Sequence, residues 1–231
     1  MQNRLADHQP CPIVILADGQ FPTHPIPLSI LMSARYIICC DGAAAKLLEA
    51  GLKPDAIVGD MDSLSETLQT EYAPIVHKDD EQEHNDLTKA VRFAIEQNPA
   101  SISIVGATGY QEDHTIGNIA LLSYYKTLID SASTINTSIN SDIPILLFTD
   151  TGRFFPITKG ASIDAPVGSN VSIFSLDTDI TIKSKGLCYP LDKVVFDSWW
   201  KATLNKTTKN PFELIFETGK VIIYITYNSR D

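Results

Sequence analysis

Short apolar runs, each followed by an aspartate or a glycine, alternate with helical segments through the first half of the chain. The runs that we expect to form buried strands are residues 12–17, 36–40, 55–58 and 101–105. Segments with helical features follow them, at residues 43–50, 86–97 and 114–128. Asn85 is expected to cap the second of these helices. Strands that alternate with helices predict an α/β N-terminal domain with a mainly parallel sheet.

The pattern changes after residue 129. Residues 131–142 are rich in Ser, Thr, Asn and Asp, which is typical of a loop or linker. Runs of β-branched and aromatic residues follow at 145–148, 153–157, 171–174, 180–182, 212–216 and 221–227. They predict a C-terminal all-β, sandwich-like domain, although the first of them could also pair with the N-terminal sheet. We therefore expect domains at residues 1–143 and 144–231.

Composition excludes several classes of protein. The formal net charge of -10 argues against nonspecific nucleic-acid binding, which needs a basic face. The four cysteines form no C-x-x-C pair, so we expect neither a structural zinc site nor a disulfide framework. The sequence has no apolar run long enough to cross a bilayer and no secretory signal pattern. We expect a cytoplasmic protein without a membrane partner.

Acidic residues follow the ends of the expected strands. Asp41 follows the second strand, Asp60 and Asp62 follow the third, and Asp86 and Asp113 lie in later acidic motifs. Ligands of open α/β sheets bind beyond the carboxyl ends of the strands, so these side chains should gather at one site. Carboxylates crowded beside a polyphosphate repel it unless hard cations lie between them. The pattern therefore predicts Mg²⁺ and phosphoryl chemistry. Taken alone, the Asp60–Asp62 motif is equally compatible with an ordinary polar turn.

Other candidates carry less information singly. Gly106, Thr108 and Gly109 lie in a small-residue turn whose backbone N–H groups could approach an anion, yet such turns are common. The chain has neither the P-loop nor the dinucleotide glycine pattern. Lys89 could reach a phosphate or simply pair with Asp86 one helical turn away. His114 is either a substrate contact or a solvated residue at a helix start.

The motifs together resemble those of the thiamine pyrophosphokinase family. The matching stretches are Asp41-Gly42-Ala43, residues 54–63, Glu83 to Ala90 and Gly106 to His114, in the family's order and spacing. The close resemblance covers residues 13–120. In the second half, residues 186–191 and 203–205 resemble two shorter family stretches less closely.

This resemblance implies a fold, a reaction and a set of site residues. ATP and Mg²⁺ would bind the α/β domain, thiamine would bind with help from the β domain of a second subunit, and the enzyme would be a homodimer. The thiamine hydroxyl would attack the β-phosphorus of ATP, and AMP would leave. Metal-site and catalytic carboxylates would be Asp60, Asp62 and Asp86, with Asp113 as a further catalytic residue. The ATP site would comprise Asp41, Gly42, Lys89, Gly106, Thr108, Gly109, Gln111 and His114, and the thiamine site Asp113, Trp199, Trp200 and Asn205. For either tryptophan, ordinary packing within the β domain is the favoured alternative.

Several positions depart from the family pattern. Gln111 replaces the family arginine, so it supplies no positive charge to phosphates. Tyr110 replaces a glycine, Ala45 an asparagine and Glu83 an aspartate. Two alternatives to the enzyme therefore remain: a noncatalytic thiamine or nucleotide sensor of the same fold, and a Mg²⁺-dependent nucleotide phosphohydrolase.

Overall fold

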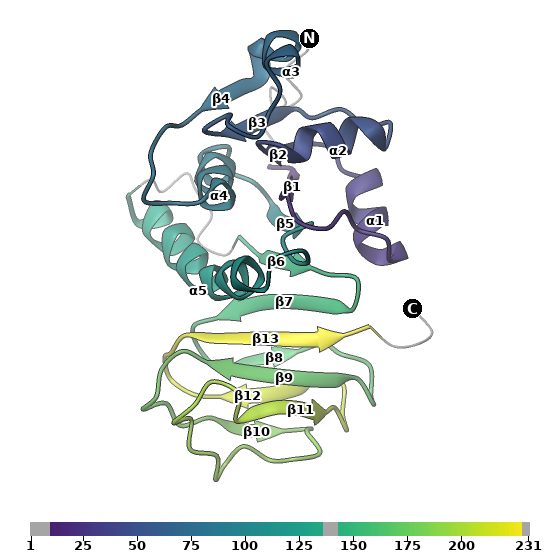
Figure 1. The fold of residues 1–231 in the computed structure, drawn as a ribbon. Coiled ribbons are helices and arrows are strands. Elements are labelled where there is room, and N and C mark those ends of the chain that lie inside the picture. Colours follow the sequence, from purple (N-terminus) through teal and green to yellow (C-terminus); the bar gives the residue numbers. More distant parts are fainter. Residues whose placement is uncertain (1–9, 136–142, 228–231) are drawn as a thin grey trace. The chain divides into compact units, whose positions relative to one another are not determined.

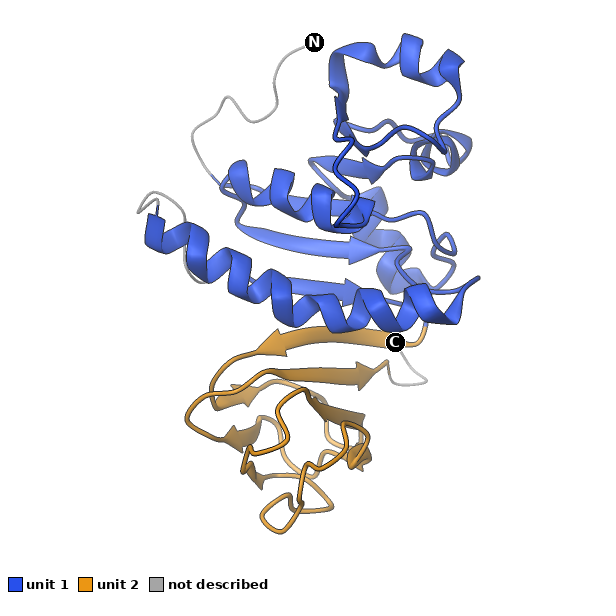
Figure 2. Ribbon diagram, turned by 60° about the vertical axis from the view of Figure 1, so that its left-hand side comes forward, with its two compact units in different colours: residues 1–150 blue, residues 151–231 orange. Residues whose placement is uncertain are grey.

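The computed structural model describes residues 10–135 and 143–227. The chain divides into two compact units, unit 1 with residues 1–150 and unit 2 with residues 151–231 (Figure 2). Unit 1 contains all the helices of the described residues, and unit 2 contains strands and irregular segments. Within the described residues, no helix combines the length and the apolar character that crossing a membrane requires.

Six parallel strands form one sheet among the described residues of unit 1 (Figure 1). They are β1 (Pro12–Leu16), β2 (Ile37–Cys40), β3 (Ala56–Gly59), β4 (Val76–Lys78), β5 (Ser101–Val105) and β6 (Ile145–Phe148). Their order across the sheet is β6-β5-β1-β2-β3-β4. The parallel sheet predicted from the sequence is confirmed, and the run at 145–148 joins it as β6. Continuous burial of β2 and β3 explains why these strands are apolar at every position.

Helices cover both faces of this sheet. They are α1 (Pro25–Met32), α2 (Ala43–Glu49), α3 (Glu66–Glu71), α4 (Asp86–Glu96) and α5 (Glu112–Ile135), with a short 3₁₀ helix at Ala73–Ile75. On one face α1 and α2 pack against β1, and on the other α4 packs against β1, β2 and β3 (Figure 1). The long helix α5 packs beside α4 and against β6.

Helix α4 forms where its sequence pattern predicts a helix. Asn85 caps its N-terminus, since its side-chain oxygen accepts a hydrogen bond of 3.0 Å from the backbone N–H of Thr88. The apolar residues of the helix lie on its buried face, which packs on the sheet: Leu87, Ala90, Val91, Ala94 and Ile95. The cap and the buried face together fix the position of Asp86 in the first turn.

Two expectations for unit 1 need correction. The helix expected at 114–128 begins at Glu112 and continues to Ile135, so residues 131–135 are helical and not a loop. Serine and threonine side chains in this last stretch bond to carbonyl oxygens of the preceding turn, as Thr134 does to Asp130, and the helix tolerates them. The remaining residues of the expected loop, 136–142, lie outside the described residues. Helices α1 and α3 carry no strong sequence pattern and were not expected.

The sheet of unit 1 has a topological switch point. From β1 the chain continues through α1 to β2 on one side, and after β4 it returns through α4 to β5 on the other side of β1. The connections after β1 and β5 therefore diverge and leave a crevice beyond the carboxyl ends of these strands. A ligand of this fold is expected there.

Unit 2 consists of two antiparallel sheets. The first has the order β11-β9-β13-β7 and the second β10-β12-β8. The strands are β7 (Gly152–Ile157), β8 (Ala161–Ile163), β9 (Asn170–Ser175), β10 (Lys183–Lys185), β11 (Ala202–Lys206), β12 (Phe212–Ile215) and β13 (Val221–Thr226). Buried residues of both sheets, among them Ile173, Phe212 and Ile223, share one hydrophobic core. This arrangement confirms the sandwich-like β domain.

The strand expected at residues 180–182 is wrong. Residues 180–182 form no strand, and β10 begins at Lys183. Ile182 is nevertheless fully buried, because it joins the core from an irregular segment. β-branched content thus identified a core position but not the hydrogen-bonded pairing, which depends on the neighbouring strand β12.

Candidate functional site

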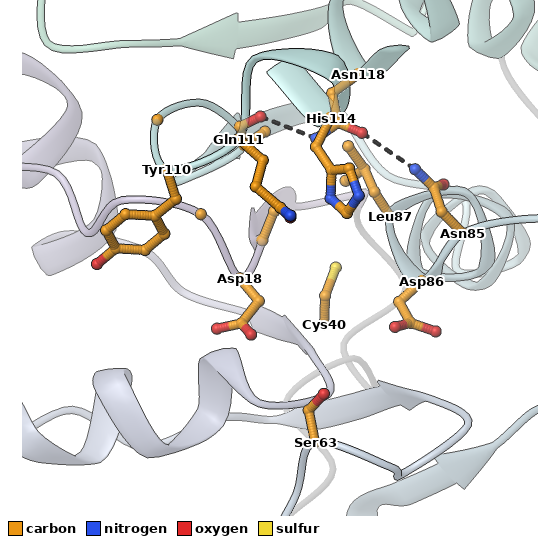
Figure 3. A pocket seen from close by; sticks show the side chains of 14 residues that line it. Asp18, Cys40, Ser63, Asn85, Asp86, Leu87, Tyr110, Gln111, His114 and Asn118 are labelled. Carbon is orange, nitrogen blue, oxygen red and sulfur yellow. Dashed lines mark hydrogen bonds between the residues drawn. The ribbon is translucent and has the colours of Figure 1, made fainter. Parts of the chain in front are cut away.

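A pocket of about 280 Å³ occupies the switch point of unit 1 (Figure 3). Its walls come from the end of β2, from the segments that follow β1, β3 and β5, and from the first turn of α4 and the first two turns of α5. The polar side chains in these walls are Asp18, Ser63, Asn85, Asp86, Tyr110, Gln111, His114 and Asn118. The described residues that line it include no lysine or arginine, so an anionic ligand would need an added cation.

Three carboxylates from separate segments meet beside this pocket. Asp41 follows β2, Asp60 follows β3 and Asp86 begins α4. One oxygen of each lies within 4.8 Å of one oxygen of the others. Asp41 and Asp86 can approach because Gly59 has no side chain: a Cβ there would lie 3.0 Å from the Cβ of Asp41 and 3.1 Å from the Cγ of Asp86. Figure 3 shows Asp86 at the pocket wall.

Asp41 has the most constrained environment of the three. Its residue is 2% exposed, and its backbone is left-handed with φ of 36°. One carboxylate oxygen accepts a 3.0 Å hydrogen bond from the backbone N–H of Ser63, whereas no donor among the described residues reaches Oδ1. Burial raises the pKa of Asp41 to about 6. A side-chain hydrogen bond with Asp62 and the charge of Asp86 add to the effect, and the Ser63 N–H opposes it. A buried carboxylate oxygen without a donor is costly unless a ligand satisfies it.

The other two carboxylates are balanced differently. The backbone N–H of Asp62, at 3.2 Å, lowers the pKa of Asp60 below its usual value, and Gln82 contributes a weaker hydrogen bond. Burial raises the pKa of Asp86, although Lys89 opposes this effect. Asp60 therefore remains ionised over a wide pH range, while Asp41 and Asp86 accept protons more readily.

Lys89 is the single cation in contact with this group of carboxylates among the described residues. It is 3% exposed, and its ammonium donates to the backbone oxygen of Asp79 at 2.9 Å and to Asp86 at 3.3 Å. The pairing with Asp86 that the sequence suggested is therefore present. Because Lys89 also holds the chain at the end of β4, it fixes the segment between β4 and α4 to the site.

Asp62 is exposed and does not belong to the group of three carboxylates. Its Oδ1 accepts a hydrogen bond of 2.9 Å from the hydroxyl of Ser63. Its charge still lies close enough to Asp41 to help raise that residue's pKa. The metal role expected for Asp62 remains a prediction.

The residues expected to bind ATP do not all line the pocket. Gly109, Gln111 and His114 line the pocket, and the last two project into it in Figure 3. Gly42 and Lys89 do not line it. Gly106 and Thr108 line a second, smaller pocket of about 40 Å³ elsewhere in unit 1, whose walls include Asp150.

The residues expected to bind thiamine lie in both units. Asp113 is exposed in the first turn of α5 and accepts a 2.9 Å hydrogen bond from the backbone N–H of His114. In unit 2, Trp199 is 45% and Trp200 59% exposed, which leaves ring surface free. Asn205 is 3% exposed, and its amide bonds to the backbone of Tyr189 at 2.7 and 3.1 Å. The binding roles of all four remain predictions.

The sequence analysis missed several residues of the pocket. Asp18 directly follows the first expected strand and was not among the expected site residues, yet it lines the pocket and pairs with Lys46 at 2.7 Å. The rule that ligands lie beyond the carboxyl ends of strands could have identified it. Asn118 left no such signal: it lies inside α5, donates to the backbone oxygen of Ala107 at 2.9 Å, and accepts from Asn85 at 3.1 Å.

The carboxylates fit a hard divalent cation. Three oxygen ligands within 4.8 Å, one of them the unpartnered Oδ1 of Asp41, match the preference of Mg²⁺ for a few carboxylates completed by water and phosphate oxygens. Lys89 neutralises only part of the negative charge, since a single ammonium contacts one of three carboxylates.

Comparisons with known proteins agree with this arrangement. The family model described as thiamin pyrophosphokinase, catalytic domain, matches residues 28–132, and the model described as thiamin pyrophosphokinase, substrate-binding domain, matches residues 152–224. The chain belongs to the thiamin pyrophosphokinase family. The resemblance stated from the motifs is thereby confirmed.

Curated relatives match this family member over part of their length. The thiamine pyrophosphokinase of Bacillus subtilis (strain 168) is 38% identical over 86 residues, which are 36% of this chain and 40% of that protein. Thiamin pyrophosphokinase 1 of Caenorhabditis elegans is 25% identical over 154 residues, 58% of this chain and 63% of that protein. The chain thus aligns with less than two thirds of the length of these relatives.

Solved structures of the family share the fold. The crystal structure of thiamine pyrophosphokinase from Bacillus subtilis superposes with a TM-score of 0.74 at 23% identity, over 94% of this chain and 99% of that one. Thiamin pyrophosphokinase from Candida albicans gives a TM-score of 0.69 at 17% identity, over 98% and 91% of the two chains. At this level of identity the superposition establishes the fold.

Proposed function

We propose that this chain transfers the pyrophosphoryl group of ATP to thiamine, with Mg²⁺, to give thiamine diphosphate and AMP. The observation that carries the proposal is the meeting of Asp41, Asp60 and Asp86 beside a pocket at the switch point of a member of this family. The unpartnered Oδ1 of Asp41 supports it further, because a bound cation would satisfy that oxygen.

In this proposal the carboxylates hold the ion and the pocket holds the nucleotide. Asp41, Asp60 and Asp86 would bind Mg²⁺, with Asp62 completing the site. When bound, the ion would neutralise charge on the phosphates that no lysine or arginine of the pocket wall neutralises. Lys89 would hold Asp86 in place.

The reaction then needs positioning more than covalent chemistry from the protein. The hydroxyl oxygen of thiamine forms a bond to the β-phosphorus of ATP, and the bond from that phosphorus to the oxygen bridging it to the α-phosphorus breaks, releasing AMP. The hydroxyl proton passes to a carboxylate of the site. Gln111 and His114, which project into the pocket, would contact the nucleotide (Figure 3).

The thiamine contacts and the assembly are part of the same proposal. Asp113, Trp199, Trp200 and Asn205 would bind or position thiamine, and the active form would be a homodimer in the cytoplasm. The exposed ring of Trp199 supports this assignment, because a cationic thiazolium is attracted to an aromatic face. The ring of Trp200 already faces the ammonium of Lys201 at 5.3 Å, so Trp200 is the weaker candidate of the two. Molecular mass in solution by light scattering tests the dimer, and a monomer that is active at every concentration would contradict it.

The activity is tested with purified chain, ATP, thiamine and Mg²⁺, with AMP and thiamine diphosphate separated by chromatography. We expect both products in equal amounts, their loss on chelation by EDTA, and a fall in turnover by orders of magnitude in Asp60→Asn. Glu49→Gln, which removes an exposed carboxylate at the end of α2, serves as the matched control and should retain full activity.

Two results would replace the proposal with one of its alternatives. Release of phosphate or pyrophosphate without thiamine would identify a nucleotide phosphohydrolase. Thiamine binding without turnover, unchanged by Gln111→Arg, would identify a sensor, since that variant restores the positive charge of the family pattern.

A further inference from the structure

Tyr110 is an aromatic residue in an unusual place. It lines the edge of the pocket, and 71% of it is exposed. Its backbone is left-handed, with φ of 64°, a conformation that a bulky residue rarely adopts. A glycine would adopt it without strain, so the ring is kept here at a conformational cost.

The turn that carries the ring is firmly held. Gly109 is also left-handed, with φ of 84°, and its backbone N–H donates a hydrogen bond of 3.2 Å to the hydroxyl oxygen of Thr115. The N–H of Gln111 donates to the oxygen of Gly109 at 2.9 Å, which closes the turn around Tyr110. The ring therefore projects from a fixed backbone and not from a loose loop.

Lys46 covers one face of the ring. Its ammonium lies 5.1 Å from the ring centroid, within the range of a cation–π contact. The ammonium is itself fixed by Asp18, through the carboxylate at 2.7 Å and the backbone oxygen at 2.9 Å, and by the backbone oxygen of Gly19 at 3.0 Å. One face of the ring is thus occupied, and the high exposure of Tyr110 leaves the other free.

The charge on the covered face selects what can stack on the free one. An aromatic ring that already faces an ammonium is a poor partner for a second cation, such as a thiazolium, because the two positive charges repel through the ring. A neutral, electron-rich heterocycle is favoured instead. Tyr110 and Asp86 also lie on opposite sides of the pocket (Figure 3), so a ligand whose phosphates are bound near Asp86 could extend toward the ring.

We infer that Tyr110, backed by Lys46, is the stacking platform for the purine base of the nucleotide substrate. This inference rests on the proposed function, in which the phosphates of the nucleotide are bound near Asp86. Tyr110 would act in binding and specificity and not in the chemical step. It would supply affinity through the base where Gln111 supplies no charge to the phosphates.

The test separates base from phosphate binding by isothermal titration with Mg²⁺–ADP, Mg²⁺–tripolyphosphate and thiamine. Tyr110→Asn removes the ring but keeps a residue that tolerates the left-handed backbone, and Tyr110→Phe keeps the ring. We expect Tyr110→Asn to weaken ADP binding by roughly 5- to 150-fold, the range for loss of one base–aromatic stack. Tyr110→Phe should bind ADP within about 2-fold of the wild type, and no variant should change the affinity for tripolyphosphate or thiamine.

Different results would contradict the stacking inference and the proposed function. If wild-type chain binds ADP and Tyr110→Asn binds it equally well, the stacking inference is wrong while the proposed function stands. If Tyr110→Asn weakens thiamine and not ADP, the ring serves the other substrate and the inference is overturned. If the wild type binds no nucleotide, both the inference and the proposed function fail. A raised KM for ATP with unchanged kcat in Tyr110→Asn would support the inference, whereas a lowered kcat alone would contradict it.

Discussion

Replacing Asp41 by asparagine should stabilise the metal-free protein while removing its response to Mg²⁺. The carboxylate is buried, its Oδ1 has no donor among the described residues, and its backbone is left-handed, a conformation that asparagine tolerates. Asparagine keeps an acceptor for the N–H of Ser63 and places an amide N–H₂ where the unpartnered oxygen lies. The variant thus removes an unfavourable charge without introducing backbone strain.

The magnitude follows from the pKa. Burial raises the pKa of Asp41 from 3.8 to about 6, and each unit of pKa corresponds to about 1.36 kcal/mol, so ionised Asp41 costs the folded state about 3 kcal/mol. The folded chain binds this proton more tightly than the unfolded chain. Wild-type stability should therefore fall as pH rises from about 4 to about 6, and stay constant with respect to this group above that. The advantage of Asp41→Asn should be close to zero at pH 4 and reach about 3 kcal/mol at neutral pH.

Urea denaturation in EDTA, followed by far-ultraviolet circular dichroism, measures this difference. The helical signal reports on unit 1, because the described helices all lie there. Adding Mg²⁺ should stabilise the wild type and leave Asp41→Asn nearly unchanged, since the variant lacks one of the three carboxylate ligands. Glu49→Gln removes the same charge at an exposed position and should change stability by less than about 0.5 kcal/mol at every pH. The reasoning is refuted if Asp41→Asn is less stable than the wild type at neutral pH in EDTA, or if the difference does not vary with pH.

Two further predictions concern the frame of unit 1. Asp150 accepts hydrogen bonds from the side chain and the N–H of Thr23 and from the N–H of His24. Burial alone would raise the pKa of Asp150, but these hydrogen bonds hold the pKa below its usual value. Asp150→Asn should therefore destabilise unit 1 by about 1–3 kcal/mol at neutral pH. Urea denaturation at pH 7 and pH 3 should show that this loss of stability becomes smaller as the pH falls through the pKa of Asp150 in the folded wild type. An equal loss at both pH values would contradict the prediction. Gly19→Ala would place a Cβ 2.4 Å from the backbone oxygen of Gly106. The substitution should lower the free energy of unfolding by about 1–3 kcal/mol and weaken ADP binding. Unchanged stability in urea would show that the two backbone segments can move apart.

The order of elements in unit 1 could be predicted because its strands and helices have strong local patterns. Helix α4 carries both a capping asparagine and a clear apolar face, and its predicted start agrees with the structure. The acidic motifs could be placed at one edge of the sheet because parallel strands all end there. The family resemblance then reached the correct family.

The rest depends on three-dimensional packing that local patterns do not encode. Asp41 was expected near the nucleotide, but its burial and its unpartnered oxygen arise from the approach of Ser63 and from the glycine at 59. Asp60 and Asp62 were expected to act alike, yet Met61 between them is left-handed with φ of 70°, so the backbone is not extended there. Asp60 joins the group of three carboxylates and Asp62 does not. The pairing of Lys46 with Asp18 joins residues 28 positions apart and left no trace in the sequence pattern.

Left-handed residues other than glycine collect around the same edge of unit 1: Asp41, Met61 and Tyr110. Replacing such residues with glycine is one route to higher thermal stability. At these three positions, however, the side chain that glycine would remove already has a role. Met61 is 5% exposed within the apolar core, Asp41 belongs to the acidic group, and Tyr110 forms the rim. Relief of the strained torsion would sacrifice a side chain that packs or faces the ligand, so thermostable variants should be sought elsewhere in the chain.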